Sequence, residues 1–213
     1  MNARRSLAGM IAALFAVGCL FAITAASASA VSKLCKVKEV NCKVVNMWNA
    51  NTVFKGEATD TKVTIEPIIE GKFVLIEITC TGSVLKAKTT ANEGAQVPAN
   101  GETLTFAGCS SKQAETCSVA AVNQNFAGGF IGSPTGSGTF ETNIVLVIKC
   151  AKPKVECTFA AGGAMQAIGG NPGSLQAAAT LELIANGSEN CPSVASWTGK
   201  YVLSEPKPIW FTE

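Results

Sequence analysis

The sequence predicts an all-β fold: an antiparallel β-sandwich or a jelly-roll-like arrangement of about nine to ten strands, stapled by disulfides. Three observations lead to this prediction. Apolar and polar residues alternate with a period of two, glycine- and proline-rich turns separate the alternating runs, and eight cysteines follow the first thirty residues. No run beyond residue 30 has the spacing and caps of an amphipathic helix. Residues 31–213 therefore suit a single β-rich domain.

The expected strands follow the alternation in order along the chain. They are residues 73–80, 83–90, 102–109, 118–122, 140–150, 173–185 and 201–203. The alanines of 173–185 suit a helix, but Leu181 and Leu183 alternate with polar neighbours, which favours a strand. Turns are expected at residues 92–94, 98–101, 133–138, 169–173 and 185–188. Residues 31–60, with a cysteine pair of their own, are expected to form a peripheral strand pair.

Residues 1–30 are typical of a secretory signal peptide. Arg4 and Arg5 precede an apolar run over 7–23, and the small residues A-S-A at 28–30 predict cleavage after Ala30. An uncleaved membrane anchor is one alternative, and a lipoprotein signal ending at Cys19 is another. We expect a secreted protein, in the extracellular space or the cell envelope, with no stable membrane span once the signal is removed.

The charge of residues 31–213 is balanced. This part contains no arginine and no histidine, and its fifteen lysines offset fourteen glutamates and Asp60. A neutral chain without arginine lacks the basic footprint of a nucleic-acid-binding protein, so no nucleic-acid partner is expected. Four lysines cluster near residue 31, and a mobile, solvated segment is favoured there over a site for a cell-surface polyanion. They are Lys33, Lys36, Lys38 and Lys43.

The cysteines of an exported chain are expected to form structural disulfides. A zinc site would need closely spaced cysteines or histidines, and a redox site would need C-x-x-C; residues 31–213 have neither. No metal ligand and no cofactor is therefore expected. Strand direction in a simple meander favours Cys80–Cys109 and Cys117–Cys150. Cys157–Cys191 remains as a third pair, and Cys35–Cys42 would close a local loop.

A purely local pairing remains open as the alternative. It would join Cys109 to Cys117 and Cys150 to Cys157, leaving Cys80 for Cys191. Both schemes place the bridges near one end of the sheet, and each bridge contributes about 2–4 kcal/mol in either case.

The inventory of catalytic groups is poor. Without histidine the usual general base is missing, and no S-x-x-K or G-x-S-x-G motif is present. The glycine-rich residues 160–173 lack the GK[ST] of a phosphate-binding loop. Trp48, Trp197 and Trp210 could stack on sugars, but core positions are favoured for tryptophans in a chain of this size. No catalytic residue is assigned, and the protein is not expected to be an enzyme.

Three segments resemble a family of exported, cysteine-containing actinobacterial proteins whose function is not established. They are "ITCTGSVLKAKTT" (78–90), "LTFAGCSSKQAETCSV" (104–119) and "CPSVASWTGKYVLSEPKPIWFTE" (191–213). The shared pattern is a strand ending in cysteine, an LTF-x-G-C strand, and a late cysteine followed by WTG-x-Y. The resemblance implies a secreted, disulfide-bonded, β-rich protein and supplies no catalytic residue.

Two hypotheses of function follow. The favoured one is a secreted, non-catalytic β-domain with a binding or structural role, whose partner would be an envelope or extracellular polymer. The alternative is a secreted glycoside hydrolase, or another carbohydrate-active protein, that uses a pair of glutamates about 5–9.5 Å apart in a cleft lined by tryptophan.

Overall fold

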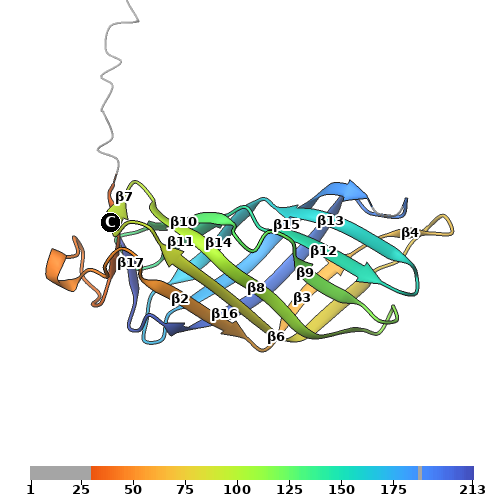
Figure 1. The fold of residues 1–213 in the computed structure, drawn as a ribbon, viewed down its shortest axis with the longest axis horizontal. Helices are drawn as coiled ribbons and strands as arrows, with labels where there is room; N and C mark the ends of the chain where they lie inside the picture. The colour runs from red at the N-terminus through yellow and green to blue at the C-terminus, as the bar shows by residue number, and fades with distance from the viewer. Residues whose placement is uncertain (1–29, 187–188) are drawn as a thin grey trace, which may run out of the picture. The chain divides into compact units, whose positions relative to one another are not determined.

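Alternating sequences form strands almost throughout the chain (Figure 1). The computed structural model describes residues 30–186 and 189–213, and residues 31–213 form one compact unit. Seventeen strands and one short 3-10 helix, η1 (Val44–Asn46), make up the regular structure of these ranges. The predicted signal peptide lies outside the described residues, apart from Ala30. The all-β prediction is confirmed, but the expected nine to ten strands are too few.

Twelve of the strands form one large sheet in which every pairing is antiparallel. They are β2 (Val53–Ala58), β3 (Thr61–Ile65), β6 (Ile76–Thr89), β8 (Val97–Ser111), β9 (Ser118–Ala121), β10 (Ala127–Gly132), β11 (Gly138–Thr142), β12 (Val145–Cys150), β13 (Val155–Ala161), β14 (Gly163–Ile168), β15 (Ser174–Asn186) and β16 (Val194–Glu205).

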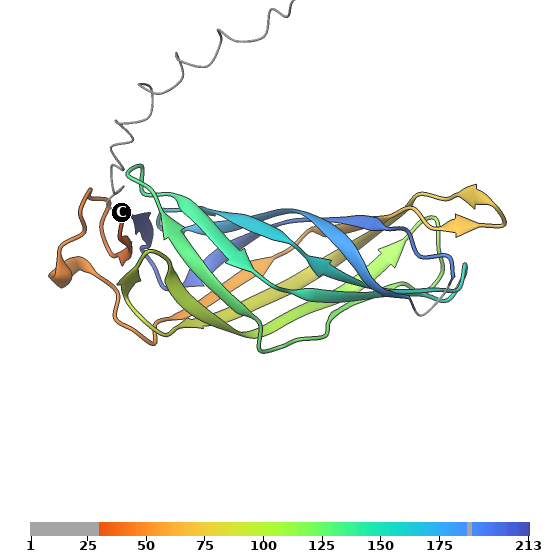
Figure 2. The ribbon, with the colours of Figure 1, turned by 90° about the horizontal axis from the view of Figure 1, so that it is seen from above.

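The large sheet closes on itself. Strand β16 pairs with β15 along one edge and with both β2 and β3 along the other, so the pairings form a complete ring. Figure 2 shows the strands wrapping around a common interior. The prediction of a sandwich or jelly roll is therefore wrong, because both of those folds need two facing sheets. A closed sheet protects most of its backbone hydrogen-bonding groups within its own ladders.

Eight positions around the closed sheet account for all twelve strands. Four positions are single long strands: β6, β8, β15 and β16. Each of the other four positions is built from two short strands in line. For example, β2 and β3 both pair with β6: Ala58 of β2 lies opposite Ser83, and Thr61 of β3 lies opposite Cys80. Neighbours in sequence are neighbours around the sheet, which is the simple up-and-down order.

The chain leaves the sheet between β9 and β10, and side chains there replace some of the missing backbone hydrogen bonds. The Leu104 backbone N–H donates to Gln124 Oε1 at 3.1 Å, and the Val145 N–H donates to Asn123 Oδ1 at 2.8 Å. Asn123 Nδ2 also donates to the Asn143 carbonyl at 2.8 Å. The amides of Asn123 and Gln124 therefore satisfy backbone groups that would otherwise lose their partners.

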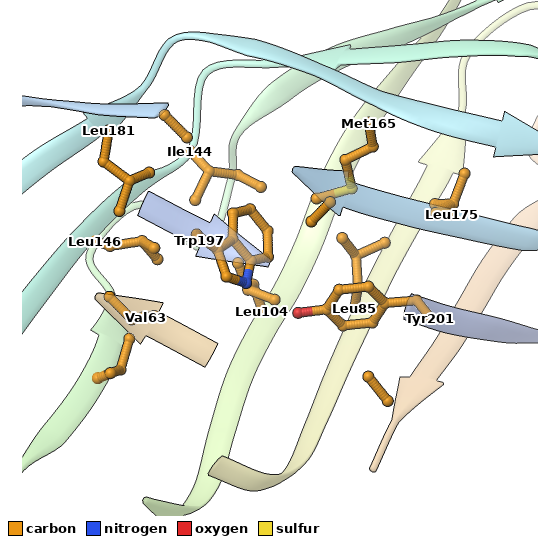
Figure 3. Close-up of a cluster of buried hydrophobic side chains, with 14 of the residues drawn as sticks. Val63, Leu85, Leu104, Ile144, Leu146, Met165, Leu175, Leu181, Trp197 and Tyr201 are labelled. Atoms are coloured by element: carbon orange, nitrogen blue, oxygen red, sulfur yellow. The ribbon is translucent and has the colours of Figure 1, made fainter. Parts of the chain in front are cut away.

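Apolar side chains of alternate residues fill the inside of the closed sheet, and lysine, glutamate and threonine line its outside. The centre of the inside holds Trp197 and Tyr201 among aliphatic residues (Figure 3). Outside, ion pairs join neighbouring strands, such as Lys149 to Glu156 at 2.8 Å and Lys62 to Glu77 at 3.5 Å. Exposed pairs of this kind contribute at most about 1 kcal/mol each, so the packed inside is the main source of stability.

Four phenylalanines form a stacked cluster toward the end of the closed sheet where β17 (Trp210–Thr212) lies. Phe130 is the centre of this cluster. Its ring centroid lies 4.5 Å from those of Phe54 and Phe140 and 5.2 Å from that of Phe211. All four rings are buried, so they anchor β17 to the large sheet.

A small three-stranded sheet covers the same end. Strand β1 (Ser32–Cys35) pairs with β17 on one side and with β7 (Glu93–Gly94) on the other. The expectation for residues 31–60 is thus only partly right, because β1 is peripheral but β2 belongs to the large sheet. The lysine-rich segment is not a free tail, since β1 and a disulfide between Cys35 and Cys42 hold it in place.

The described structure contains four disulfides, and they are the four favoured pairs. They join Cys35–Cys42, Cys80–Cys109, Cys117–Cys150 and Cys157–Cys191. The strand arrangement expected around Cys80 is wrong. Residues 73–80 and 83–90 were expected to be a strand and its return, but they lie largely in one fourteen-residue strand, β6. Cys80 faces Cys109 directly across the β6–β8 ladder, with 3.9 Å between their Cα atoms.

The turn expected at residues 98–101 is also wrong. "PANG" lies inside β8 and pairs with both β6 and β10. Gly101 is needed there for a different reason: a Cβ at this position would lie 2.3 Å from the ring of Phe126. The glycine makes room for an aromatic ring instead of reversing the chain.

Candidate functional site

A two-stranded hairpin projects from the end of the closed sheet that lies away from β1 (Figures 1 and 2). It consists of β4 (Ile68–Ile69) and β5 (Lys72–Phe73), with Ile68 opposite Phe73. Glu70 and Gly71 connect them, and both have positive φ values, 49° and 76°. Two such residues in a row form the tight turn that matches the twist of a hairpin.

Large apolar side chains are exposed on and beside this hairpin. Phe73 is 77% exposed, Leu75 52%, Val194 53% and Ile68 44%. A single exposed apolar residue is ordinary, but several together around one feature indicate an interaction surface. Phe73 is the one aromatic residue among the exposed large apolar residues of the described chain.

A groove of about 530 Å³ runs between the hairpin and residues 191–196, which lead into β16. We call it the hairpin groove. Ile68, Phe73 and Val194 supply its larger apolar side chains, Pro192 and Ala195 add smaller ones, and threonine and serine contribute hydroxyl groups. The exposed Glu66 supplies a carboxylate. A groove with one aromatic platform and several hydroxyl groups suits a ligand that has both apolar faces and hydrogen-bonding groups.

A disulfide fixes one wall of the hairpin groove. Cys191, at the start of that wall, is bonded to Cys157 in the middle of the buried face of β13. The wall continues into β16, where Ala195 pairs with Ile65 of β3. The groove is therefore built on the rigid sheet on one side and on the projecting hairpin on the other.

Two further grooves lie on the outside of the closed sheet. One, of about 440 Å³, crosses β14, β15 and β16 and is lined by Gln166, Gln176 and Lys200. The other, of about 390 Å³, lies at the ends of β6 and β8 beside Glu77 and Lys112. Each of the three grooves holds no more than one carboxylate and no tryptophan, so none supplies the glutamate pair that glycoside hydrolysis requires.

The tryptophans are divided between the inside and the β1 end of the closed sheet. Trp197 is buried in the core. Trp48 and Trp210 are half-buried, and the ammonium groups of Lys36 and Lys38 lie over their rings, 5.3 Å and 5.5 Å from the respective centroids. Trp48 Nε1 also donates to the Pro208 carbonyl at 3.1 Å. None of the three lines the hairpin groove.

A buried polar group lies at the centre of the closed sheet. The Tyr201 hydroxyl is 2.9 Å from Ser83 Oγ, and Ser83 Oγ donates its proton to the Thr105 carbonyl at 2.7 Å. Tyr201 must then donate to Ser83. Burial raises the pKa of Tyr201, and hydrogen bonds from Ser83 and Trp197 to the phenolate would offset this only in part. The Trp197 N–H is directed toward that hydroxyl (Figure 3), but neither it nor Thr61 Oγ1 makes a hydrogen bond in the described chain.

This central group has the chemistry of a core and not of an active site. Tyr201, Ser83 and Trp197 are all buried, and the surrounding side chains are apolar. Within residues 30–186 and 189–213, no cluster of three or more histidine, cysteine, aspartate or glutamate side chains is arranged to hold a metal ion. Nor does this part of the chain contain a helix that is both long and apolar enough to cross a membrane.

The sequence patterns alone do not indicate the hairpin groove. Alternation places Phe73 at the start of a longer strand and gives Glu66, Ile68 and Val194 no functional role. The segment "IIEGKF" (68–73) does indicate a hairpin, because an E-G pair between apolar residues is a hairpin pattern.

No family model matches the chain, and neither a curated protein nor a solved structure is significantly similar to it.

Proposed function

We propose that the chain is an exported, non-catalytic β-domain that binds an extracellular or cell-envelope polymer in the hairpin groove. The observation that carries the proposal is the groove itself, where an exposed phenylalanine lies beside hydroxyl groups and one carboxylate. Phe73 would pack against an apolar face of a sugar or similar unit. Glu66 and the threonine and serine hydroxyls would hydrogen-bond its polar groups.

The disulfides support the exported part of the proposal. Four disulfides in one chain are typical of an oxidising compartment, outside the cytoplasm. The apolar signal-like segment of residues 7–23 fits the same location. The resemblance to exported actinobacterial proteins is also part of this proposal.

The groove favours binding over cleavage. A glycosidase needs one carboxyl group as an acid and a second as a base or nucleophile, and Glu66 is the one carboxylate lining the groove. The alternative of a glycoside hydrolase therefore has less support, and the experiment below also addresses it.

The test uses purified residues 31–213 with disulfides formed. The protein is sedimented with insoluble envelope polymers and applied to a glycan array, and bound fractions are compared with those of Phe73→Ala. We expect at least one polymer to be bound and the variant to bind it about fivefold or more weakly, as for an aromatic anchor. Val122→Ala is the control, because Val122 is 58% exposed but does not line the groove.

The possible outcomes separate the hypotheses. Equal binding by wild type and Phe73→Ala, or no binding to any polymer, would contradict the proposal. Release of soluble reducing sugars during the incubation, lost in Glu66→Gln, would favour the hydrolase instead.

A further inference from the structure

A second exposed surface lies at the other end of the closed sheet, in residues 36–45. We call it the lysine–valine loop. The disulfide between Cys35 and Cys42 closes most of it, and its last two residues, Val44 and Val45, begin η1. This end carries β1 and β17, whereas the hairpin groove lies at the end marked by β4 (Figure 1). The two surfaces are therefore separate, and the inference below does not depend on the proposed function.

Four valines of this loop are exposed to water. Val44 is 83% exposed, Val45 78%, Val40 63% and Val37 41%. Val37 and Val40 lie within the ring that the Cys35–Cys42 disulfide closes, and Val44 and Val45 lie in η1 just outside it. The Lys36 N–H donates to the Asn46 carbonyl at 2.7 Å, and Cys35 and Cys42 are buried against Met47, so both parts are held in place. Apolar side chains held in water in this way indicate a surface that becomes covered in use.

Lysines are interspersed with these valines along the loop. Lys36, Lys38 and Lys43 carry three charges, and none of them forms an ion pair with a carboxylate in the described part of the chain. The one acidic residue of the loop is Glu39, whose Oε1 accepts hydrogen bonds from the Lys43 N–H and from Asn46 Nδ2, both at 2.9 Å. The loop therefore keeps a net positive charge although residues 31–213 as a whole are neutral.

Two carboxylates outside the loop lie at this end. Glu93 is opposite Lys33 in the β1–β7 ladder, and Glu213 follows Thr212, which is opposite Lys33 in the β1–β17 ladder. In the described residues neither forms an ion pair with a lysine of the loop. Lys36 and Lys38 lie over the rings of Trp48 and Trp210, so their charges are held at the base of the loop. Such cation–π contacts orient the ammonium groups without neutralising them.

We propose that the lysine–valine loop docks on an anionic phospholipid bilayer, with its valines entering the headgroup region and its lysines contacting lipid phosphates. Proteins that bind at a membrane interface combine exposed apolar side chains with nearby lysines. A soluble polyanion would be recognised by the lysines alone and would leave the valines in water. The valines are therefore the observation that favours a bilayer.

The test measures partition of residues 31–213, with disulfides formed, onto vesicles by co-sedimentation. The vesicles contain phosphatidylcholine alone or phosphatidylcholine with 30% phosphatidylglycerol, which are the two probes. We expect binding only to the anionic vesicles. Binding should weaken as salt rises from about 0.05 to 0.15 M, because the Debye length then falls from about 14 Å to about 8 Å.

Two double variants separate the contributions. Lys38→Gln with Lys43→Gln should lower the partition coefficient about thirtyfold, since each lysine near an anionic surface contributes about a factor of five. Val44→Ser with Val45→Ser should lower it about fivefold or more, because these side chains would no longer leave water. Lys112→Gln with Val122→Ser is the matched control and should bind like the wild type. All three pairs are compared by thermal unfolding to show that the fold is intact.

Three results would overturn the proposal. One is the absence of binding to anionic vesicles at low salt. Another is unchanged binding by the valine variant while the lysine variant binds weakly, which would assign the loop to a soluble polyanion. The third is an equal loss in the matched control, which would show non-specific attraction.

Discussion

Tyr201 makes the stability of this protein depend on pH in a way that can be calculated. It is the chain's one tyrosine, it is fully buried, and burial raises its pKa above the ordinary value of about 10. Because the pKa of this phenol is higher in the folded state than in the unfolded state, folding favours its neutral form. This contribution is fully present below pH 10 and is lost as pH rises from about 10 toward the folded pKa.

The size of this pH effect on stability follows from the ionisation of Tyr201, which loses its proton near pH ~10 only in the unfolded chain. At pH 11, one unit above the unfolded pKa, the unfolded state gains about 1.4 kcal/mol from ionisation that the folded state does not share. Tyr201→Phe removes this pH dependence. At pH 7 the same variant should be less stable by about 1 kcal/mol, because Tyr201 no longer donates to Ser83 at 2.9 Å.

The free energies of unfolding of the two proteins should therefore cross near pH ~10.6, where the ionisation gain equals the lost hydrogen bond. Urea unfolding of residues 31–213 at pH 7, 9, 10 and 11 measures this. The fifteen lysines also titrate in this range, but they are common to both proteins and cancel in the difference. Tyrosinate absorbance near 295 nm gives an independent measurement and should rise only when the protein unfolds.

Two results would refute this reasoning. One is a tyrosinate signal in the folded protein with a midpoint near pH 10, which would mean that the hydroxyl reaches water. The other is a difference between wild type and Tyr201→Phe that stays constant from pH 7 to pH 11.

Three further predictions concern the core and the disulfides. Phe130→Ala should lower the free energy of unfolding, measured by urea unfolding, by about 3–5 kcal/mol, because three aromatic neighbours lose their central ring. Phe73 is exposed, so Phe73→Ala should change the same free energy by less than about 0.5 kcal/mol. Gly101→Ala should cost about 1–3 kcal/mol because its Cβ would overlap the Phe126 ring, whereas Gly162→Ala has nothing within 4 Å and should be close to neutral; comparable losses in both would contradict the packing argument. Intact-mass analysis of residues 31–213 should give a value eight hydrogens below that of the reduced chain, and free thiols or bound zinc would be inconsistent with the four disulfides.

Local patterns predicted the class of the fold because a period of two is a property of each strand by itself. Leu146 and Ile148 alternate with exposed or half-exposed neighbours in β12, as the sequence suggested. Closure of the sheet is different, because it depends on β16 meeting β2 and β3 from the opposite end of the domain. No short segment contains that information, so a sandwich was an equally reasonable prediction.

Strand number was underestimated because interruptions and turns look alike in sequence. Asn123 and Gln124 would mark a turn by composition, but their side chains bond to Val145 and Leu104 and bridge a break between collinear strands. Thr81 and Gly82 separate the two strands expected at 73–80 and 83–90, but they lie inside β6. Glycine in a strand can mark a close approach instead of a reversal, and only the neighbour across the sheet decides which.

The candidate site could be predicted least. The hairpin groove depends on Phe73 and Val194, which are more than a hundred residues apart, and on the bond between Cys157 and Cys191. The lysines near residue 36 were visible in the sequence and were expected to be mobile. Their placement over Trp48 and Trp210 depends on β17 returning beside β1, which is again a contact between distant segments.

The pairing of β1 with β17 has a practical consequence for handling this protein. Leu34 lies opposite Phe211, so residues 31 and 213 leave the domain from the same end. An affinity tag or a sensor chip attached through either terminus would hold that end and leave the projecting hairpin pointing into the analyte solution. Immobilised material is thus suited to ligand screening at the groove, whereas vesicle assays call for untagged protein.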